Sequence, residues 1–229
     1  MTDHVRDLAS VRDATDRLLS AAARLDNALL AEASRLPGWS RGHVLAHLAR
    51  NADALGNVLL GRPMYASENT RDAEIERDAP RPLPAQLSDL RRSAARFEGA
   101  TEKSADWSRT VELRNGVTDT ASNIPFRRWI ELEIHHADLG IGYELEDLPE
   151  EFTEREIGFL ADRFAGPLGA NVPATELTDG TRAWRTGHGD GPRITVTGTA
   201  PGLLGWLAGR RDGSALTVKG GALPGLPSL

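Results

Sequence analysis

Four long segments in which apolar residues recur with the period of an α-helix dominate the first 140 residues. They cover about residues 4–33, 41–60, 84–102 and 125–139. An amphipathic helix becomes stable when its apolar stripe is buried against other helices. Four such helices in succession therefore predict a four-helix bundle.

The residues between these segments predict where the helices begin and end. LPGW at 36–39 interrupts the apolar pattern, and Ser40 is suited to cap the N-terminus of the next helix. The polar, proline-bounded stretch 61–82 predicts a long loop. Asn115 and Gly116 lie between two β-prone runs and predict the turn of a short hairpin.

The pattern changes after a fifth expected helix at about 153–164, for which Thr153 is the predicted N-cap. Short β-prone runs then alternate with Gly and Asp turns, and a short helix is predicted at about 201–208. The expected fold class is therefore α+β. We predict a helical domain at 1–165 and a small α/β domain at 166–229.

Two of the expected helices carry pairs of metal-binding side chains. His43 and His47 are four residues apart, and so are Glu131 and His135. Side chains at i and i+4 lie on the same face of a helix, and helical bundles bind divalent metals with such carboxylates and imidazoles. The same residues are equally consistent with ordinary hydrogen-bonded or solvent-facing positions. The spacing alone leaves both interpretations open.

The chain contains no cysteine, which limits the chemistry of any such site. Disulfides, thiolate zinc ligands and a cysteine nucleophile are excluded, so thiol chemistry would need a small-molecule sulfur. A net charge of −6 argues against a nucleic-acid partner. The sequence shows neither an apolar run long enough to cross a membrane nor a secretory signal. We therefore expect a cytoplasmic protein without membrane partners.

Three motifs resemble those of the mycothiol-dependent maleylpyruvate isomerase family. They are LPGWSRGHVLAHLARNADAL, RWIELEIHHADLG and the terminal GWLAGRRDGSALTVKGGALPGLPSL, and together the resemblance spans nearly the whole chain. It implies a DinB-like four-helix metal-binding domain with a small α/β domain behind it. It also implies Zn²⁺ ligation by His47, Glu131 and His135. His43 and His136 match no ligand position in the family, so we expect structural roles for them.

The resemblance further implies an activity with mycothiol as cofactor. The thiolate adds to the cis double bond of maleylpyruvate, the adduct rotates, and elimination gives fumarylpyruvate. Arg210 is the expected catalytic arginine that binds substrate or thiol, although the doublet with Arg211 leaves its register open. Because the substrate is a dicarboxylate, Arg50 is a second candidate for a clamp, and Asn51 for orienting a ligand.

Two other functions remain open at this point. A mycothiol S-transferase would use the same site to conjugate the thiol to another electrophile. A non-catalytic, metal-dependent binding protein could use the same scaffold. In either enzymatic case we expect a monomer whose partners are a small dicarboxylate or other electrophile and a low-molecular-weight thiol.

Overall fold

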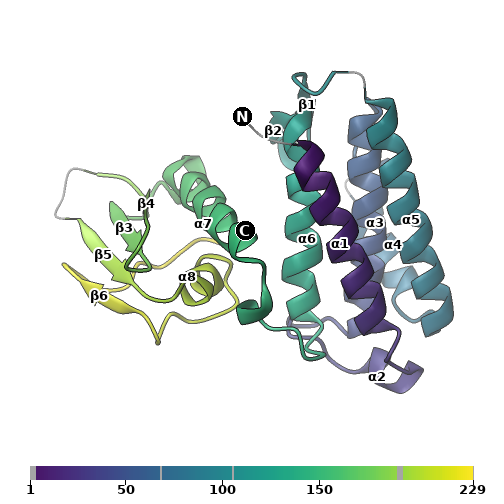
Figure 1. Cartoon of the computed structure of the whole chain (residues 1–229), viewed down its shortest axis with the longest axis horizontal. Helices are drawn as coiled ribbons and strands as arrows, with labels where there is room; N and C mark the ends of the chain where they lie inside the picture. The colour runs from purple at the N-terminus through teal and green to yellow at the C-terminus, as the bar shows by residue number, and fades with distance from the viewer. Residues whose placement is uncertain (1–3, 68, 105, 190–192, 229) are drawn as a thin grey trace. The chain divides into compact units, whose positions relative to one another are not determined.

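The computed structural model describes residues 4–67, 69–104, 106–189 and 193–228 (Figure 1). The chain divides into two compact units, Met1–Tyr143 and Glu144–Leu229. Each unit has its own buried apolar residues, so each is described separately below. None of the helices in the described ranges is both long enough and apolar enough to span a membrane.

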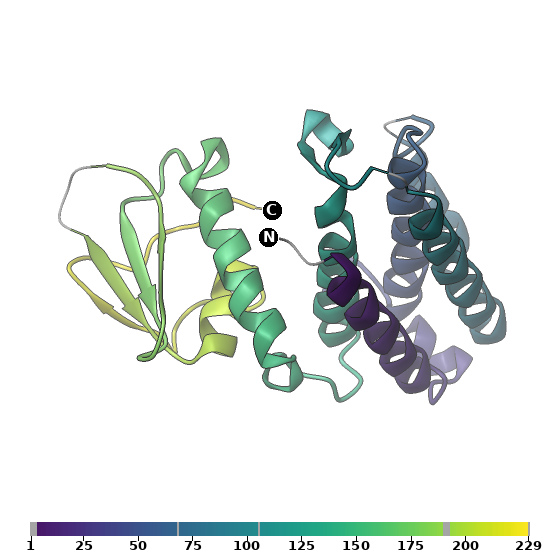
Figure 2. The same cartoon turned by 45° about the horizontal axis from the view of Figure 1, so that its top comes forward.

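Four long helices form the core of the first unit and confirm the predicted bundle (Figures 1 and 2). They are α1 (His4–Ala22), α3 (Arg41–Leu59), α5 (Leu83–Lys103) and α6 (Ile124–Asp138). Helices α1 and α3 each contact both α5 and α6, which closes the bundle. One fully buried leucine from each helix illustrates this core: Leu18, Leu48, Leu90 and Leu132.

The first predicted helix is in fact two helices, because α2 (Asn27–Ala31) follows α1 after a turn. The Asp26 side chain accepts a hydrogen bond from the Leu29 backbone at 2.7 Å and so begins a new helix. The predicted cap of α3 is confirmed, since Ser40 accepts from the His43 backbone. His43 Nδ1 in turn accepts from the Ser40 backbone at 3.2 Å, which gives His43 a structural role.

The stretch 61–82 is not the continuous loop that the sequence predicts, because it contains α4 (Thr70–Asp78). This helix contacts α3 and buries Ile75 against the bundle. The chain at Ala79, just after α4, lies close to Gly42 on α3, and this close approach requires a residue without a side chain at position 42. A Cβ atom at Gly42 would lie 2.4 Å from the Ala79 carbonyl oxygen.

The predicted hairpin is confirmed. Strand β1 (Thr110–Glu112) pairs antiparallel with β2 (Thr118–Thr120), and the short helix η1 (Arg114–Gly116) joins them. Asn115 has a φ of 60° in this turn, which is a conformation that asparagine tolerates better than most residues. A second short helix, η2 (Ala121–Asn123), leads directly into α6.

The second unit is a four-stranded sheet with two helices. The strand order is β4-β3-β5-β6, with the central pair β3–β5 parallel and the two outer pairs antiparallel. The strands are β3 (Thr175–Thr178), β4 (Ala183–Thr186), β5 (Ile194–Thr197) and β6 (Thr217–Lys219). Helix α7 (Glu150–Ala165) packs against β4 and α8 (Ala200–Leu207), and η3 (Leu145–Asp147) and η4 (Pro167–Gly169) flank it (Figure 1).

The structural division therefore falls before α7, whereas the sequence places the boundary near residue 165. The reason is that α7 packs against β4 and α8 of the second unit. Its buried residues include Phe152 and Ile157. The predicted N-cap is also wrong. Helix α7 already begins at Glu150, and the Thr153 hydroxyl donates to the Pro149 carbonyl oxygen at 3.2 Å.

Candidate metal centre

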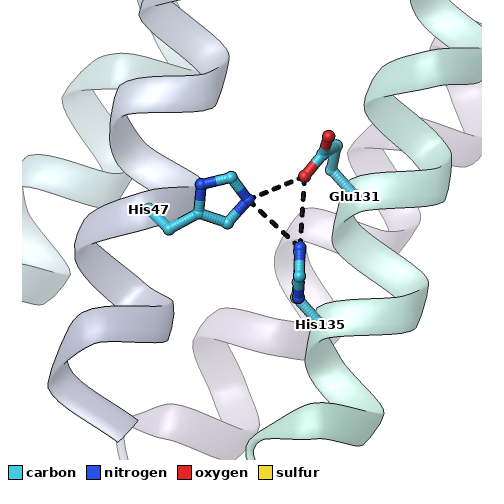
Figure 3. Close-up of side chains that lie close together, drawn as sticks. All are labelled: His47, Glu131 and His135. Atoms are coloured by element: carbon cyan, nitrogen blue, oxygen red, sulfur yellow. Dashed lines mark hydrogen bonds and ion pairs between the residues drawn. The ribbon is translucent and has the colours of Figure 1, made fainter. Parts of the chain in front are cut away.

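Helices α3 and α6 bring together the three ligands predicted from the sequence (Figure 3). His47 Nε2 lies 2.8 Å from Glu131 Oε2 and 3.1 Å from His135 Nε2. The ligand atoms of the three residues all lie within 4.8 Å of one another. Within the described part of the chain, no other group of three His, Asp or Glu residues meets this spacing. This cluster is called the metal centre below.

The rotation of α6 decides which of its polar residues reach the metal centre. Because consecutive helical residues are turned by roughly 100°, Glu133 and His136 project elsewhere. Glu133 is buried and accepts hydrogen bonds from Trp129 Nε1 at 2.9 Å and from the Tyr143 hydroxyl at 2.7 Å. His136 is buried and stacks on the Tyr143 ring, with centroids 4.1 Å apart. Both residues therefore fix α6 rather than bind a metal, as expected for His136.

A buried carboxylate orients one of the imidazoles. Asp138 is only 1% exposed, and its Oδ2 lies 2.8 Å from His135 Nδ1. This contact fixes the ring so that Nε2 faces the metal centre, which is the usual arrangement behind metal-binding histidines. The sequence interpretation assigned no role to Asp138, although its i+3 spacing from His135 was the available signal.

The electrostatics of the metal centre suit a cation. Burial lowers the pKa of His47 to about 4, which outweighs the opposite effect of Glu131, so this imidazole is neutral near pH 7. Burial would raise the pKa of Glu131, but hydrogen bonds with His135 and His47 hold it well below its ordinary value. Burial would lower the pKa of His135, but hydrogen bonds to Asp138 and Glu131 raise it.

Two imidazole nitrogens and one carboxylate oxygen form a donor set that fits a divalent transition metal. Such ligands suit Zn²⁺ and several other first-row ions. Structural zinc sites usually have four protein ligands, whereas catalytic sites keep one position for water or substrate. Three protein ligands at this site therefore match the catalytic pattern.

Three further residues surround the metal centre and are called the rim below: Trp39, Tyr65 and Arg71. Arg71 Nη2 lies 3.4 Å from His47 Nδ1, and its guanidinium carbon is 5.9 Å from the centroid of the Trp39 ring. The Trp39 and His47 rings are 5.5 Å apart. The sequence interpretation did not identify Arg71, because it lies within α4, in the stretch for which a loop was predicted.

Tyr65 is the third rim residue, and its environment connects it to the metal centre. Burial raises the pKa of the Tyr65 phenol to about 12, whereas the charge of Arg71 and its hydrogen bond to the phenol lower it. The Glu131 carboxylate raises the pKa further. The phenol is therefore neutral at physiological pH and available as a hydrogen-bond donor.

Arg50 and Asn51 occupy buried hydrogen-bond networks within the bundle. Arg50 Nη2 donates to Asp89 Oδ2 at 2.7 Å and so ties α3 to α5. Asn51 is 3% exposed, and its Oδ1 accepts from Arg128 Nη1 at 2.8 Å, which ties α3 to α6. These contacts favour structural roles, and the ligand-binding roles that the sequence suggested for Arg50 and Asn51 stay predictions.

The C-terminal arginine doublet belongs to the second unit. Arg210 Nη1 donates to the Ala208 carbonyl oxygen at 2.7 Å. Arg211 instead forms an ion pair with Glu146 at 2.8 Å. The anion-binding role that the sequence suggested for Arg210 stays a prediction.

Comparisons with known proteins agree with the two-unit organisation. The family model described as the mycothiol maleylpyruvate isomerase N-terminal domain matches residues 11–140, and the matching C-terminal domain model covers residues 147–227. A crystal structure of a mycothiol-dependent maleylpyruvate isomerase is similar with a TM-score of 0.84 and 28% identity. A crystal structure of a histidine-to-alanine mutant of such an enzyme is similar with a TM-score of 0.84 and 27% identity.

Each of these two structures aligns over 99% of this chain and 97% of its own length. A comparison with curated proteins gives no match. The two domain models together cover most of the chain, in the order and at the places where the two structural units lie. The chain belongs to the mycothiol maleylpyruvate isomerase family.

Proposed function

We propose that the protein is a zinc- and mycothiol-dependent isomerase that converts maleylpyruvate to fumarylpyruvate. The observation that carries this proposal is the convergence of His47, Glu131 and His135 in a chain that has no cysteine of its own. Family membership and the two similar isomerase structures support the choice of thiol and substrate.

The residues of the metal centre would hold Zn²⁺ through two imidazole nitrogens and one carboxylate oxygen. When bound, the ion would supply positive charge that favours the thiolate form of a thiol at neutral pH. His47 offers a neutral nitrogen, and Asp138 holds the His135 ring in the orientation that ligation needs. Glu131 contributes the negative charge that makes the site selective for a cation.

In the proposed reaction the thiolate adds to the cis double bond, the resulting single bond rotates, and the thiolate leaves. A covalent adduct replaces one high rotational barrier by two lower steps, and the thiol is regenerated. The substrate carries two carboxylates, for which arginine side chains are suitable partners. Arg210 is the proposed clamp, and we expect the protein to act as a cytoplasmic monomer.

An ultraviolet assay of the zinc-loaded protein tests this function. With mycothiol and maleylpyruvate, we expect formation of fumarylpyruvate without net loss of free thiol. Stoichiometric consumption of thiol would instead identify an S-transferase. A protein that binds zinc but leaves maleylpyruvate and other electrophiles unchanged would be a binding protein, and the proposed function would be wrong.

A further inference from the structure

A polar cavity lies beside the metal centre within the first unit. Its volume is about 1030 Å³. One wall is formed by residues from Gly61 to Tyr65 together with Ser67, Asn69 and Asp72. The other is formed by the β1–β2 hairpin, from Arg109 to Gly116. The hairpin wall is attached to the bundle, because Arg109 Nη2 donates to the carbonyl oxygens of Val58 and Leu59 at 3.0 and 2.7 Å.

Hydrogen-bonding groups dominate the lining of this cavity. Charged, amide and hydroxyl side chains come from both walls: Arg62, Ser67, Asn69, Glu112, Arg114 and Asn115. Binding sites for ordinary organic ligands are lined mainly by hydrophobic and aromatic side chains. A lining that offers both donors and acceptors suits a ligand that carries many hydroxyl groups, such as a sugar.

Two residues of the cavity lining, Asp72 and Tyr65, connect this cavity to the metal centre, Asp72 through Arg71. Asp72 lines the cavity, and its Oδ1 accepts a hydrogen bond from Arg71 Nη1 at 2.7 Å. Arg71 Nη2 in turn lies 3.4 Å from His47 Nδ1. Tyr65 also lines the cavity and interacts with both Arg71 and Glu131. A ligand in the cavity would therefore have one end next to the rim.

We propose that this cavity binds the hydroxyl-rich body of a sugar-bearing thiol, and that Tyr65 and Arg71 position its sulfur at the metal centre. This inference rests on the proposed function, because it assigns a place to the thiol of that reaction. The size of the cavity is part of the argument. A four-carbon or six-carbon diacid would fill only a small part of about 1030 Å³, whereas a thiol with sugar rings would fill much more.

Calorimetric titration with S-methylmycothiol tests the cavity independently of thiolate chemistry, because this ligand has no ionisable sulfur. In the zinc-loaded protein, Glu112→Trp should raise the Kd at least tenfold by filling the cavity. Arg114→Ala should also raise it by removing a donor. Thr118→Trp is the matched control. Thr118 pairs with Glu112 in the hairpin but does not line the cavity, so its Kd should stay within twofold of wild type.

Wild-type Kd values in both cavity variants would overturn the proposal, as would absence of binding to the wild-type protein. The proposal would also be overturned if the cavity variants bound maleate more weakly than wild type but bound S-methylmycothiol equally well. The cavity would then bind the dicarboxylate rather than the thiol. Circular dichroism checks that each variant is folded. If the wild-type protein binds S-methylmycothiol but produces no fumarylpyruvate, the proposed function fails while the assignment of the cavity stands.

The positioning roles of Tyr65 and Arg71 need a spectroscopic readout. Cobalt replaces zinc in sites of this donor type and gives a charge-transfer absorption band when a thiolate binds to it. At saturating mycothiol, Tyr65→Phe and Arg71→Ala should weaken this band at least twofold while cobalt content stays constant. Arg77→Ala is the matched control, because Arg77 also lies on α4 and also pairs with the aspartate that follows it. An unchanged band in both rim variants would refute the positioning roles.

Discussion

The metal centre and the rim adjoin each other but have different structural origins. The metal centre is built from residues on α3 and α6, two long helices whose apolar faces are buried in the bundle. The rim comes from the turn before α3, the segment after it and the short helix α4. Under the proposed function, rigid elements would hold the metal, while ligand selection would depend on segments that can vary without disturbing the bundle.

The largest expected effect concerns the metal centre. His47→Ala should abolish stoichiometric zinc, because two remaining protein ligands do not form a stable site. Elemental analysis after dialysis measures this directly. His43→Ala is the control and should retain zinc, since His43 completes the cap of α3 and its Nε2 lies 3.4 Å from Glu76 Oε2, outside the metal centre. Full zinc content in the His47 variant would show that the metal centre does not bind as described.

The next effect tests whether the contact between Asp138 and His135 contributes to zinc affinity. Asp138→Asn should weaken zinc binding by about 10- to 100-fold, because the amide orients His135 less well and removes a buried negative charge. Competition with a chromogenic chelator gives the affinity. Zinc affinity equal to wild type would mean that Asp138 serves only the fold.

The rim should behave differently from the metal centre. Arg71→Ala should raise the KM for mycothiol or substrate about tenfold, as expected for loss of one charge-assisted hydrogen bond. Its zinc content should not change, and steady-state kinetics together with elemental analysis distinguish the two effects. Loss of zinc in this variant would remove the proposed distinction between the rim and the metal centre.

The pH dependence sharpens the comparison further. His135 has a raised pKa in the folded, metal-free protein, so it stabilises that state below its unfolded pKa of about 6.5. This contribution is lost as the pH rises through the folded pKa. Zinc needs the deprotonated ring, so zinc affinity should increase about tenfold per pH unit below that pKa.

Thermal melts with and without zinc measure this trend. The difference in Tm between the two forms should widen as the pH rises from 5 to 8. A difference that is constant over this range would show that no ligand loses a proton on binding.

The smallest expected effect distinguishes two roles for Arg50: the substrate clamp suggested by the sequence and the structural ion pair with Asp89. Arg50→Gln should lower the free energy of unfolding by about 1 kcal/mol, because the ion pair with Asp89 is lost. The KM for maleylpyruvate should not change. Urea denaturation and kinetics provide the two measurements, and a KM raised tenfold would instead support Arg50 as part of the substrate clamp.

The three candidate ligands could be identified from the sequence because their spacing and their motifs are properties of single helices. Glu131 and His135 lie one turn apart on α6, and the resemblance identified His47 on α3. Their convergence follows from the bundle. The α+β class and the hairpin were also accessible from local patterns, since apolar periodicity and the Asn115-Gly116 turn act over a few residues.

The rim and the unit boundary could not be predicted by the same reasoning. Helix α4 is strongly polar, and Ile75 is its one buried apolar side chain, so its sequence lacks an apolar stripe. Its helical structure depends on contacts with α3 that no local pattern reveals. The boundary was misplaced because α7 has the same amphipathic character as the bundle helices, and only its tertiary contacts assign it to the sheet.

The buried contacts of Glu133 have a consequence for how α6 can change. Trp129 donates to this carboxylate from within α6, whereas Tyr143, which follows α6, and Arg17 on α1 donate to it from outside the helix. The helix therefore cannot turn about its own axis without breaking the contacts with Tyr143 and Arg17. A single inserted or deleted residue between Trp129 and Glu131 would turn the ligand pair by roughly 100° relative to Trp129. Many surface residues of α6 can therefore be substituted, but the number of residues between Trp129 and Glu131 cannot change. Glu133 must keep its buried hydrogen bonds while Glu131, two residues away, must face the metal centre.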